Sequence, residues 1–322
     1  MNSSALTGRD LAAALAVVVI WGLNFVAMKF ALHDFSPFQL GAARYLAAAL
    51  PLVFVVKLPK MHWKWVLVYG LFQGVGQFGF LFSALKVGMT GALASVLMQT
   101  QVFFTALFGF GLLKERLSRP LSLGLVLAAL GLACFTMPFI ASYAMPTVAD
   151  GQFGPQFGPS NGSVATLWGL VLNLCAAAMW GASNIVARKA QRASPDFDAL
   201  GFVVWSSLAP ILPFVLLSWL FDTNAAAFLD ASTWRAIAPA SWLSVAFLGW
   251  VATVAAYTLW TQLLKRHSAN RVAPFSLGVP VVGLASGILI LGEAVTPWQW
   301  AGVALILLAL VGVLLGGRWL SR

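Results

Sequence analysis

The sequence predicts an all-α membrane protein of ten transmembrane helices, built as two inverted five-helix repeats with cytoplasmic N- and C-termini. First, 61% of the 322 residues are hydrophobic and only 9% are charged, whereas soluble domains are roughly half apolar. Second, the apolar residues form ten runs of the length, about 20 residues, that a spanning helix needs. Third, the basic residues lie in small clusters between the runs, a pattern typical of membrane topology and not of a nucleic-acid-binding surface.

The apolar runs fall into two groups separated by one long connection. The first group, within residues 1–138, predicts helices over Leu11–Leu32, Phe38–Val56, Trp65–Leu85, Thr90–Leu113 and Leu121–Pro138. The second group, within residues 164–322, predicts helices over Leu167–Arg188, Leu200–Phe221, Ser241–Leu264, Arg271–Leu291 and Trp298–Gly316. The connection, residues 139–163, is rich in Gly and Pro and contains the unit QFGP twice, so we expect an extracytoplasmic loop there.

The distribution of Lys and Arg sets the orientation. If the N-terminus is cytoplasmic, the outside connections hold only Lys86 and Arg235. Fifteen of the nineteen basic residues then lie on the cytoplasmic side, namely Arg9, Lys57, Lys60, Lys64, Lys114, Arg116, Arg119, Arg188, Lys189, Arg192, Lys265, Arg266, Arg271, Arg318 and Arg322. The positive-inside rule therefore predicts that both termini face the cytoplasm.

Short motifs recur at matching places in the two halves. Trp21-Gly22-Leu23-Asn24 in the first run is echoed by Trp180-Gly181-Ala182-Ser183-Asn184 in the sixth, and Glu115 after the fourth run is echoed by Glu293 after the ninth. Because each half contains an odd number of spans, the second half must enter the membrane upside down. The sequence therefore predicts an inverted repeat.

Polar and aromatic side chains at similar depth predict a central cavity. A neutral amide left unpaired in hydrocarbon costs a few kcal/mol, so these side chains must face each other, the backbone or a wet cavity. Hydrogen bonding between helices is the alternative to substrate contact for any single amide. The candidates near half depth are Trp21, Asn24, Gln77, Gln99, Gln101 and Trp180, with Asn184 and Tyr257 closer to the cytoplasm.

Other residues could take part in transport or could serve only the structure. Pro280 weakens the hydrogen-bond ladder of its run, which either frees carbonyls for a ligand or simply kinks the helix. Lys29 and Arg44 lie near the outer ends of two spans, where they could line an outward vestibule that attracts a carboxylate, or reach the headgroups or Asp34. Glu115 and Glu293 precede a helix and could cap that helix or act in a gate.

The sequence also lacks several features that a proton antiporter, an enzyme or a metalloprotein would need. All nine acidic residues and the three histidines lie outside the spans or at their edges, which argues against a carboxylate-based proton antiporter. Gly283-Leu284-Ala285-Ser286-Gly287 superficially resembles a serine nucleophile loop, but no span contains a histidine to serve as base, so we expect helix packing and no enzyme. Cys134 and Cys175 lie in apolar runs, and we expect no metal site and no cofactor.

The paired Trp-Gly motifs and the turns KERLS and LGEAVT resemble the EamA family of drug/metabolite transporters, over nearly the whole chain. The segments VVVIWGLNFVAMKFALH, ASVLMQTQVFFTALFG and RVAPFSLGVPVVGLASGILILGE are similar to its O-acetylserine/cysteine exporter branch. The resemblance implies the ten-helix fold, a central cavity and efflux of small metabolites. It carries over Trp21, Asn24, Gln99, Gln101, Trp180, Asn184 and Pro280 as matching motif positions.

The resulting expectation is a transporter that exports small amino-acid-like metabolites of the cysteine/O-acetylserine type by alternating access, in the bacterial inner membrane. A carrier of another class, for nucleotide sugars or drug-like compounds, is the alternative within transport, and an intramembrane enzyme is the alternative outside it. The expected partners are a small-molecule substrate and membrane lipids, without nucleic acid. One chain of ten helices can enclose a pathway, so a monomer is sufficient and a dimer is left open.

Overall fold

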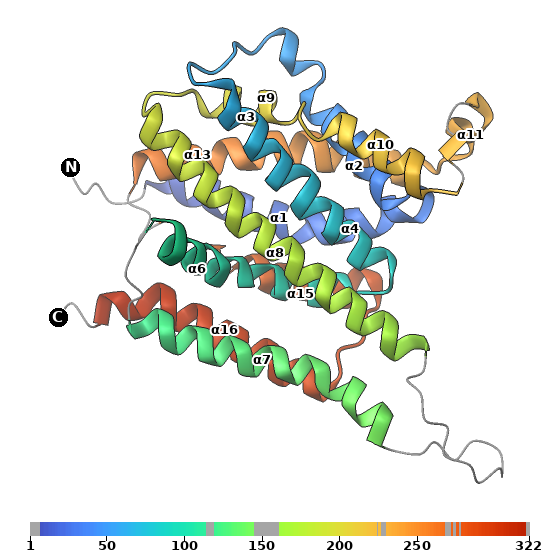
Figure 1. The fold of residues 1–322 in the computed structure, drawn as a ribbon, viewed down its shortest axis with the longest axis vertical. Helices are drawn as coiled ribbons and strands as arrows, with labels where there is room; N and C mark the ends of the chain where they lie inside the picture. Colours follow the sequence, from blue (N-terminus) through green and yellow to red (C-terminus); the bar gives the residue numbers. More distant parts are fainter. Residues whose placement is uncertain are drawn as a thin grey trace.

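The computed structural model describes residues 7–113, 119–144, 161–223, 225–226, 230–267, 272, 275–276 and 278–319, and within these residues it contains helices and no strand. The long helices lie roughly side by side (Figure 1). α1 begins and α16 ends on the same side of the molecule (Figure 1). Helices α7 and α16 pack closely against each other at one edge (Figure 1).

The first group of helices follows the predicted runs with interruptions. Its elements are α1 (Gly8–Asp34), α2 (Pro37–Ala49), η1 (Leu52–Phe54), α3 (Trp63–Gly70), η2 (Leu71–Phe78), α4 (Gly79–Lys86), α5 (Gly91–Leu97), η3 (Met98–Thr100), α6 (Gln101–Leu113) and α7 (Arg119–Ala144). The run predicted over Phe38–Val56 is not one continuous helix, because α2 ends at Ala49 and only the short η1 follows. Pro51 lacks the backbone N–H that a continuing helix needs.

The second group shows the same agreement with similar interruptions. Its elements are α8 (Asn161–Ala193), α9 (Ala199–Ser206), α10 (Ile211–Phe221), α11 (Ala231–Ala236), α12 (Pro239–Ala246), η5 (Phe247–Ala255), α13 (Ala256–Arg266), α15 (Gly278–Leu291) and α16 (Pro297–Trp319). The connection predicted over residues 139–163 is shorter than expected, since α7 continues to Ala144 and α8 begins at Asn161. Residues 145–160 lie outside the described part of the chain.

Length and composition make this a multi-pass membrane protein. Six described helical segments are long and apolar enough to span a bilayer: Gly8–Asp34, Trp63–Lys86, Gly91–Leu112, Leu167–Ala193, Ala199–Phe221 and Pro239–Leu263. Shorter apolar helices cover Ser122–Phe135, Gly278–Leu291 and Pro297–Gly312. Large apolar side chains such as Leu289 and Leu220 are more than 70% exposed, which suits a surface in contact with lipid and not with water.

Two of the long helical segments contain a π-helix in their middle. η2 interrupts the segment from α3 to α4, and η5 interrupts the segment from α12 to α13. A π-helix is rare and has a wider turn with i→i+5 hydrogen bonds, and it occurs frequently at functional sites. Both segments contribute side chains to the centre of the molecule, which makes this region the first place to look for a site.

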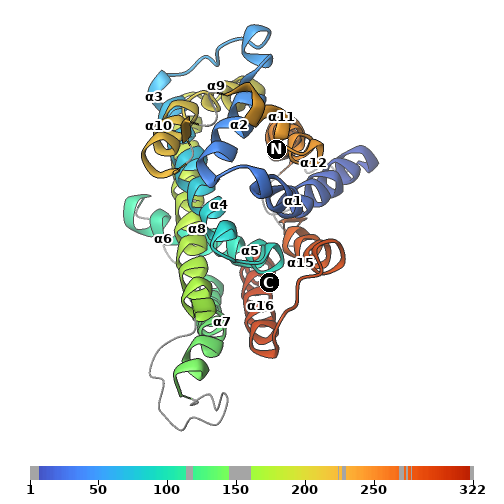
Figure 2. The ribbon, with the colours of Figure 1, turned by 90° about the vertical axis from the view of Figure 1, so that its right-hand side faces the viewer.

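Small residues bring α1, α5 and α15 into close contact, and Figure 2 shows the three helices as neighbours. A Cβ added at Gly283 would lie 2.3 Å from the Cβ of Ser95, and one at Gly287 would lie 2.8 Å from the backbone nitrogen of Ala92. A Cβ at Gly22 would lie 2.4 Å from Cγ1 of Val282. The motif from Gly283 to Gly287 therefore packs helices together, as the sequence predicts.

Candidate functional site

A small, partly enclosed cavity lies where the two groups of helices meet. Its volume is about 30 Å³. Its walls come from α1, α2, the segment around η2, α5, η3, α8, α13 and α15, so both groups of helices contribute. The lining residues are Trp21, Asn24, Phe25, Arg44, Gln77, Phe78, Leu81, Ser95, Met98, Gln99, Trp180, Tyr257 and Val279.

Six of the nine residues predicted to contact substrate line this cavity, namely Trp21, Asn24, Gln77, Gln99, Trp180 and Tyr257. Gln101 and Asn184 do not: the Asn184 side-chain amide donates to Oε1 of Gln101 at 2.8 Å and to Oγ1 of Thr105 at 3.0 Å. For these two residues the structure shows the alternative role, a hydrogen bond between α6 and α8. Pro280 does not line the cavity either, and its carbonyl accepts a 3.4 Å hydrogen bond from Ser95 on α5.

Aromatic side chains form one wall of the cavity. The Trp21 ring lies 5.0 Å from the Tyr257 ring and 5.5 Å from the Trp260 ring, measured between centroids. Its indole nitrogen donates to the carbonyl oxygen of Ala252, within η5, at 3.2 Å. These contacts fix the Trp21 ring between α1 and the η5–α13 segment.

Gln73 belongs to the same polar network although the sequence reasoning missed it. Its side-chain amide donates to the Tyr257 hydroxyl, and its Oε1 accepts from Ser183 on α8 at 3.1 Å. Gln73 precedes Gln77 by four residues, a spacing that places side chains on similar helix faces and could have identified it. Gln99 is also held, because its amide donates to the carbonyl oxygen of Ser276 at 2.7 Å.

Arg44 lies deeper than the outer vestibule in which we expected it, and it lines the central cavity with a side chain only 1% exposed. Its Nε and Nη2 atoms donate to Oγ1 of Thr253 on η5, at 3.1 and 3.0 Å. Its Cζ lies 3.8 Å from the centroid of the Phe78 ring, in cation–π contact. The placement follows from α2, which begins at Pro37 and carries Arg44 about two turns inward.

Lys29 lies in the last two turns of α1 and does not line the cavity. Its ammonium donates to the carbonyl oxygen of Leu85, near the end of α4, at 3.2 Å. Asp34, which we considered as its partner, instead accepts from the backbone nitrogen of Ala238 at 3.0 Å and from the Ser241 hydroxyl at 2.7 Å. Lys29 and Arg44 therefore do not form a common vestibule in this structure.

Glu293 caps a helix, but not the one that follows it in the chain. Its two carboxylate oxygens accept from the backbone nitrogens of Gly91 and Ala92, each at 2.7 Å. These nitrogens are free donors at the start of α5, and a carboxylate there also complements the helix dipole. The expectation that Glu293 caps the next helix, α16, is therefore wrong. Glu115 lies outside the described residues.

Three side-chain atoms around the cavity are buried without any hydrogen-bond partner among the described residues: Oδ1 of Asn24, Nη1 of Arg44 and Oε1 of Gln77. The salt bridges of the described chain leave Arg44 without a carboxylate within 4 Å. Buried polar groups in native proteins are nearly always paired. One cationic donor and two acceptors are thus free to bind a polar ligand in the cavity.

The lining contains no acidic residue and no histidine. Within the described residues, no group of three or more His, Cys, Asp or Glu side chains could hold a metal ion. The chemistry that these side chains offer is hydrogen bonding, one positive charge and aromatic contact. Such a set can hold a ligand, and it contains no activated nucleophile.

Comparison with known proteins identifies the family. The EamA-like transporter family matches residues 10–137 and again residues 167–315. The chain belongs to the EamA-like transporter family. It is 39% identical over 310 residues to a protein of Salmonella typhimurium named "Probable amino-acid metabolite efflux pump", with 95% of this chain and 94% of that protein covered. A protein of Escherichia coli with the same name is 37% identical over 314 residues, covering 98% and 97% of the two chains.

A solved structure also resembles this member of the EamA-like family. A protein known by crystal structure, whose title states no function, is 21% identical and superimposes with a TM-score of 0.60. The similarity covers 98% of this chain and 99% of the other, and at this identity it shows the fold alone. The family and the efflux-pump relatives indicate a transporter and not an enzyme.

Proposed function

We propose that this protein exports small amino-acid-like metabolites, of the cysteine/O-acetylserine type, across the bacterial inner membrane by alternating access. The observation that carries the proposal is the cavity between the two groups of helices, lined by Arg44, Asn24 and Gln77, each of which has a polar atom without a partner among the described residues. The names of the Salmonella typhimurium and Escherichia coli relatives support the substrate class. Binding near the middle of the membrane between two halves is typical of secondary transporters.

The proposal includes ten spans in two inverted halves, residues 1–138 and 164–322. The six long apolar segments and the shorter helices α2, α7, α15 and α16 supply ten spans. The same family matches each half separately, which supports a repeat. The two π-helical segments lie in the third span of each half by this count, which also supports it.

Contacts at the helix ends join segments that lie on the same side of the membrane in the proposed topology. At the start of α1, the Asp10 carboxylate lies 3.0 Å from Nε2 of His267 and 3.5 Å from a guanidinium nitrogen of Arg266 at the end of α13. Both helix ends are cytoplasmic in the proposed topology. At the other end of α1, Asp34 binds the start of α12, which is extracytoplasmic in the same topology.

We propose facilitated transport because no carboxylate or imidazole lines the cavity to carry a proton. A carrier of another metabolite class, such as nucleotide sugars or drug-like compounds, is the second candidate. It is disfavoured because a cavity of about 30 Å³ must expand further for a bulky substrate. A buried arginine without a counter-ion also disfavours lipophilic cations.

The test is uptake into liposomes that contain the purified protein. Labelled cysteine and O-acetylserine are offered with and without an imposed proton gradient, and other amino acids serve as competitors. We expect saturable uptake that does not depend on the gradient. A Leu289→Ala variant, changed at a side chain 82% exposed, should match the wild type. Gradient-driven uptake would contradict the facilitated mechanism, and no uptake of any amino acid would contradict the substrate class.

A further inference from the structure

We infer that the cavity selects zwitterions: the Arg44 guanidinium binds the substrate's carboxylate, while the side-chain oxygens of Asn24 and Gln77 bind its ammonium group. This inference rests on the proposed function and specifies how the site recognises its substrate. All three side chains line the same cavity, and each has one buried polar atom without a partner. The three atoms differ in character, one being a cationic donor and two being neutral acceptors.

The donor side of the site calls for an anion. Nε and Nη2 of Arg44 are already bound to Thr253, so Nη1 is the atom left for a ligand. The nearest partners of this guanidinium are a hydroxyl and the Phe78 ring, and neither carries a compensating charge. A buried charge is strongly disfavoured until an opposite charge joins it. A carboxylate satisfies Nη1 with a charge-assisted hydrogen bond, stronger than one to a neutral acceptor.

The acceptor side calls for a donor-rich group. Asn24 on α1 and Gln77 on η2 each have a buried carbonyl oxygen that accepts no hydrogen bond from the described residues. An ammonium group carries three donors and no acceptor, so it can satisfy both oxygens at once. A carboxylate placed there instead would meet two acceptors and leave them unpaired. The two ends of the site therefore distinguish the two ends of an amino acid.

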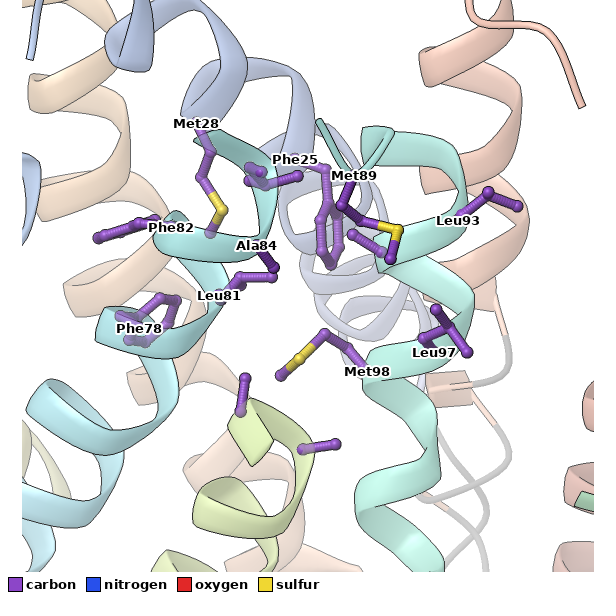
Figure 3. Close-up of a cluster of buried hydrophobic side chains, with 14 of the residues drawn as sticks. Phe25, Met28, Phe78, Leu81, Phe82, Ala84, Met89, Leu93, Leu97 and Met98 are labelled. Atoms are coloured by element: carbon purple, nitrogen blue, oxygen red, sulfur yellow. The ribbon is translucent and has the colours of Figure 1, made fainter. Parts of the chain in front are cut away.

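The rest of the wall determines which side chains fit. Phe78, Leu81 and Met98 line the cavity, and all three are at most 3% exposed. Figure 3 shows Met98 extending from its helix toward Leu81. A substrate side chain would meet this apolar and polarisable surface. Small uncharged side chains, including thiols and thioethers, suit it, and a second charge does not. Because the cavity has a volume of only about 30 Å³, the helices that line it must move apart to admit an amino acid.

The test uses four compounds that share one thiol side chain. Cysteine has both charged groups, cysteine methyl ester lacks the carboxylate, 3-mercaptopropionate lacks the ammonium, and cysteamine lacks the carboxyl group altogether. Each competes with labelled cysteine or O-acetylserine, whichever gives the greater uptake, in liposomes holding the wild-type full chain. We expect cysteine to compete at least about tenfold better than each of the other three, the scale of one lost charge-assisted hydrogen bond.

Variants then assign each charge to its side of the site. In Arg44→Gln, the preference for cysteine over its methyl ester should fall to about one, while the preference over 3-mercaptopropionate remains. In Gln77→Leu, the preference for cysteine over 3-mercaptopropionate should fall to about one, while the preference over the methyl ester remains. Lys86→Gln, which removes a cation that binds the Leu32 carbonyl away from the cavity, is the matched control and should keep both preferences. A folding defect lowers the competition by all four compounds alike, so the ratios between compounds report recognition and not folding.

Two results separate this inference from the proposed function. If amino acids are transported but the ester or 3-mercaptopropionate competes within about twofold of cysteine in the wild type, the zwitterion site is wrong and the function stands. If no amino acid is transported at all, the proposed function fails, and the inference fails with it. The wild-type measurement alone decides between these results, even if no variant folds.

Discussion

Two cavities of the molecule differ in size and in chemistry. A lateral pocket of about 580 Å³ lies between α2, α10 and α12, and the central cavity measures about 30 Å³. The lateral pocket is lined mainly by apolar side chains, including Trp219, Trp234, Trp242 and Trp250. One helix separates the two: Ala43 and Ala47 of α2 face the lateral pocket, and Arg44 faces the central cavity.

Several polar groups of the lateral pocket have partners, whereas three polar atoms in side chains that line the central cavity have none among the described residues. Trp250 donates to the Ala47 carbonyl oxygen at 2.7 Å, and the Ser218 hydroxyl donates to Asp222 at 2.7 Å. Gln39 accepts from the backbone nitrogen of Ser36 at 2.8 Å. Free polar atoms, and not volume, therefore indicate where a polar ligand binds. The lateral pocket suits hydrocarbon.

The largest expected effect comes from removing the charge between the two cavities. Arg44→Leu should lower the initial rate of amino-acid uptake by about tenfold or more, because it removes the only charged group among the described residues that line the central cavity. Uptake into liposomes with matched protein content measures it. Val215→Ala, in the lateral pocket, is the paired variant and should keep the wild-type rate. Equal loss in both variants would remove the functional distinction between the cavities.

A second prediction concerns the close packing of α15 against α5 beside the central cavity. Gly283→Val should lower the stability by about 1–3 kcal/mol, the usual cost of overpacking, because even a Cβ at this position would lie 2.3 Å from that of Ser95. Thermal unfolding of the detergent-purified protein measures the change. Gly312→Val is the matched control, since a Cβ at Gly312 meets nothing within 4 Å. If both variants unfold at the wild-type temperature, the close contact of α5 with α15 is not stabilising.

A third, smaller effect is expected at the outer end of the same helix pair. Glu293→Ala should cost about 0.5–2 kcal/mol, the range for a lost helix cap, because the amides of Gly91 and Ala92 lose their acceptor. Faster hydrogen exchange at these two amides is the specific readout. Glu293→Gln keeps one acceptor oxygen and should fall between the wild type and Glu293→Ala. Unchanged exchange in Glu293→Ala would show that the cap contributes nothing.

The smallest effect is predicted for filling the lateral pocket. Ala43→Leu should leave the uptake rate within about twofold, since substitutions away from key contacts usually change free energies by less than about 0.5 kcal/mol. The same uptake assay measures it, with the Arg44→Leu variant as reference. A loss comparable to that of Arg44→Leu would place the lateral pocket on the transport route.

Much of this architecture could be predicted because a membrane-spanning helix can be recognised by the length of its apolar run. The apolar runs located nearly every helix, and depth within each run brought Trp21, Asn24 and Gln99 to one cavity. Partners across the fold could not be predicted in the same way. Nothing near Glu293 in the chain indicates α5, and nothing near Arg44 indicates Thr253, 209 residues away. The π-helices also escaped prediction, because an apolar run has the same composition whichever helix type it forms.

The cap that Glu293 provides also orders events during synthesis of the chain. The amide of Gly91 and the carboxylate that it binds are 202 residues apart in the sequence. At a usual rate of synthesis of about 5–20 residues per second, Glu293 is added roughly 10 to 40 s after Gly91. Until then, water, lipid headgroups or the insertion machinery must accept the hydrogen bonds of these amides. The cap of α5 therefore forms only after the chain has been extended to Glu293.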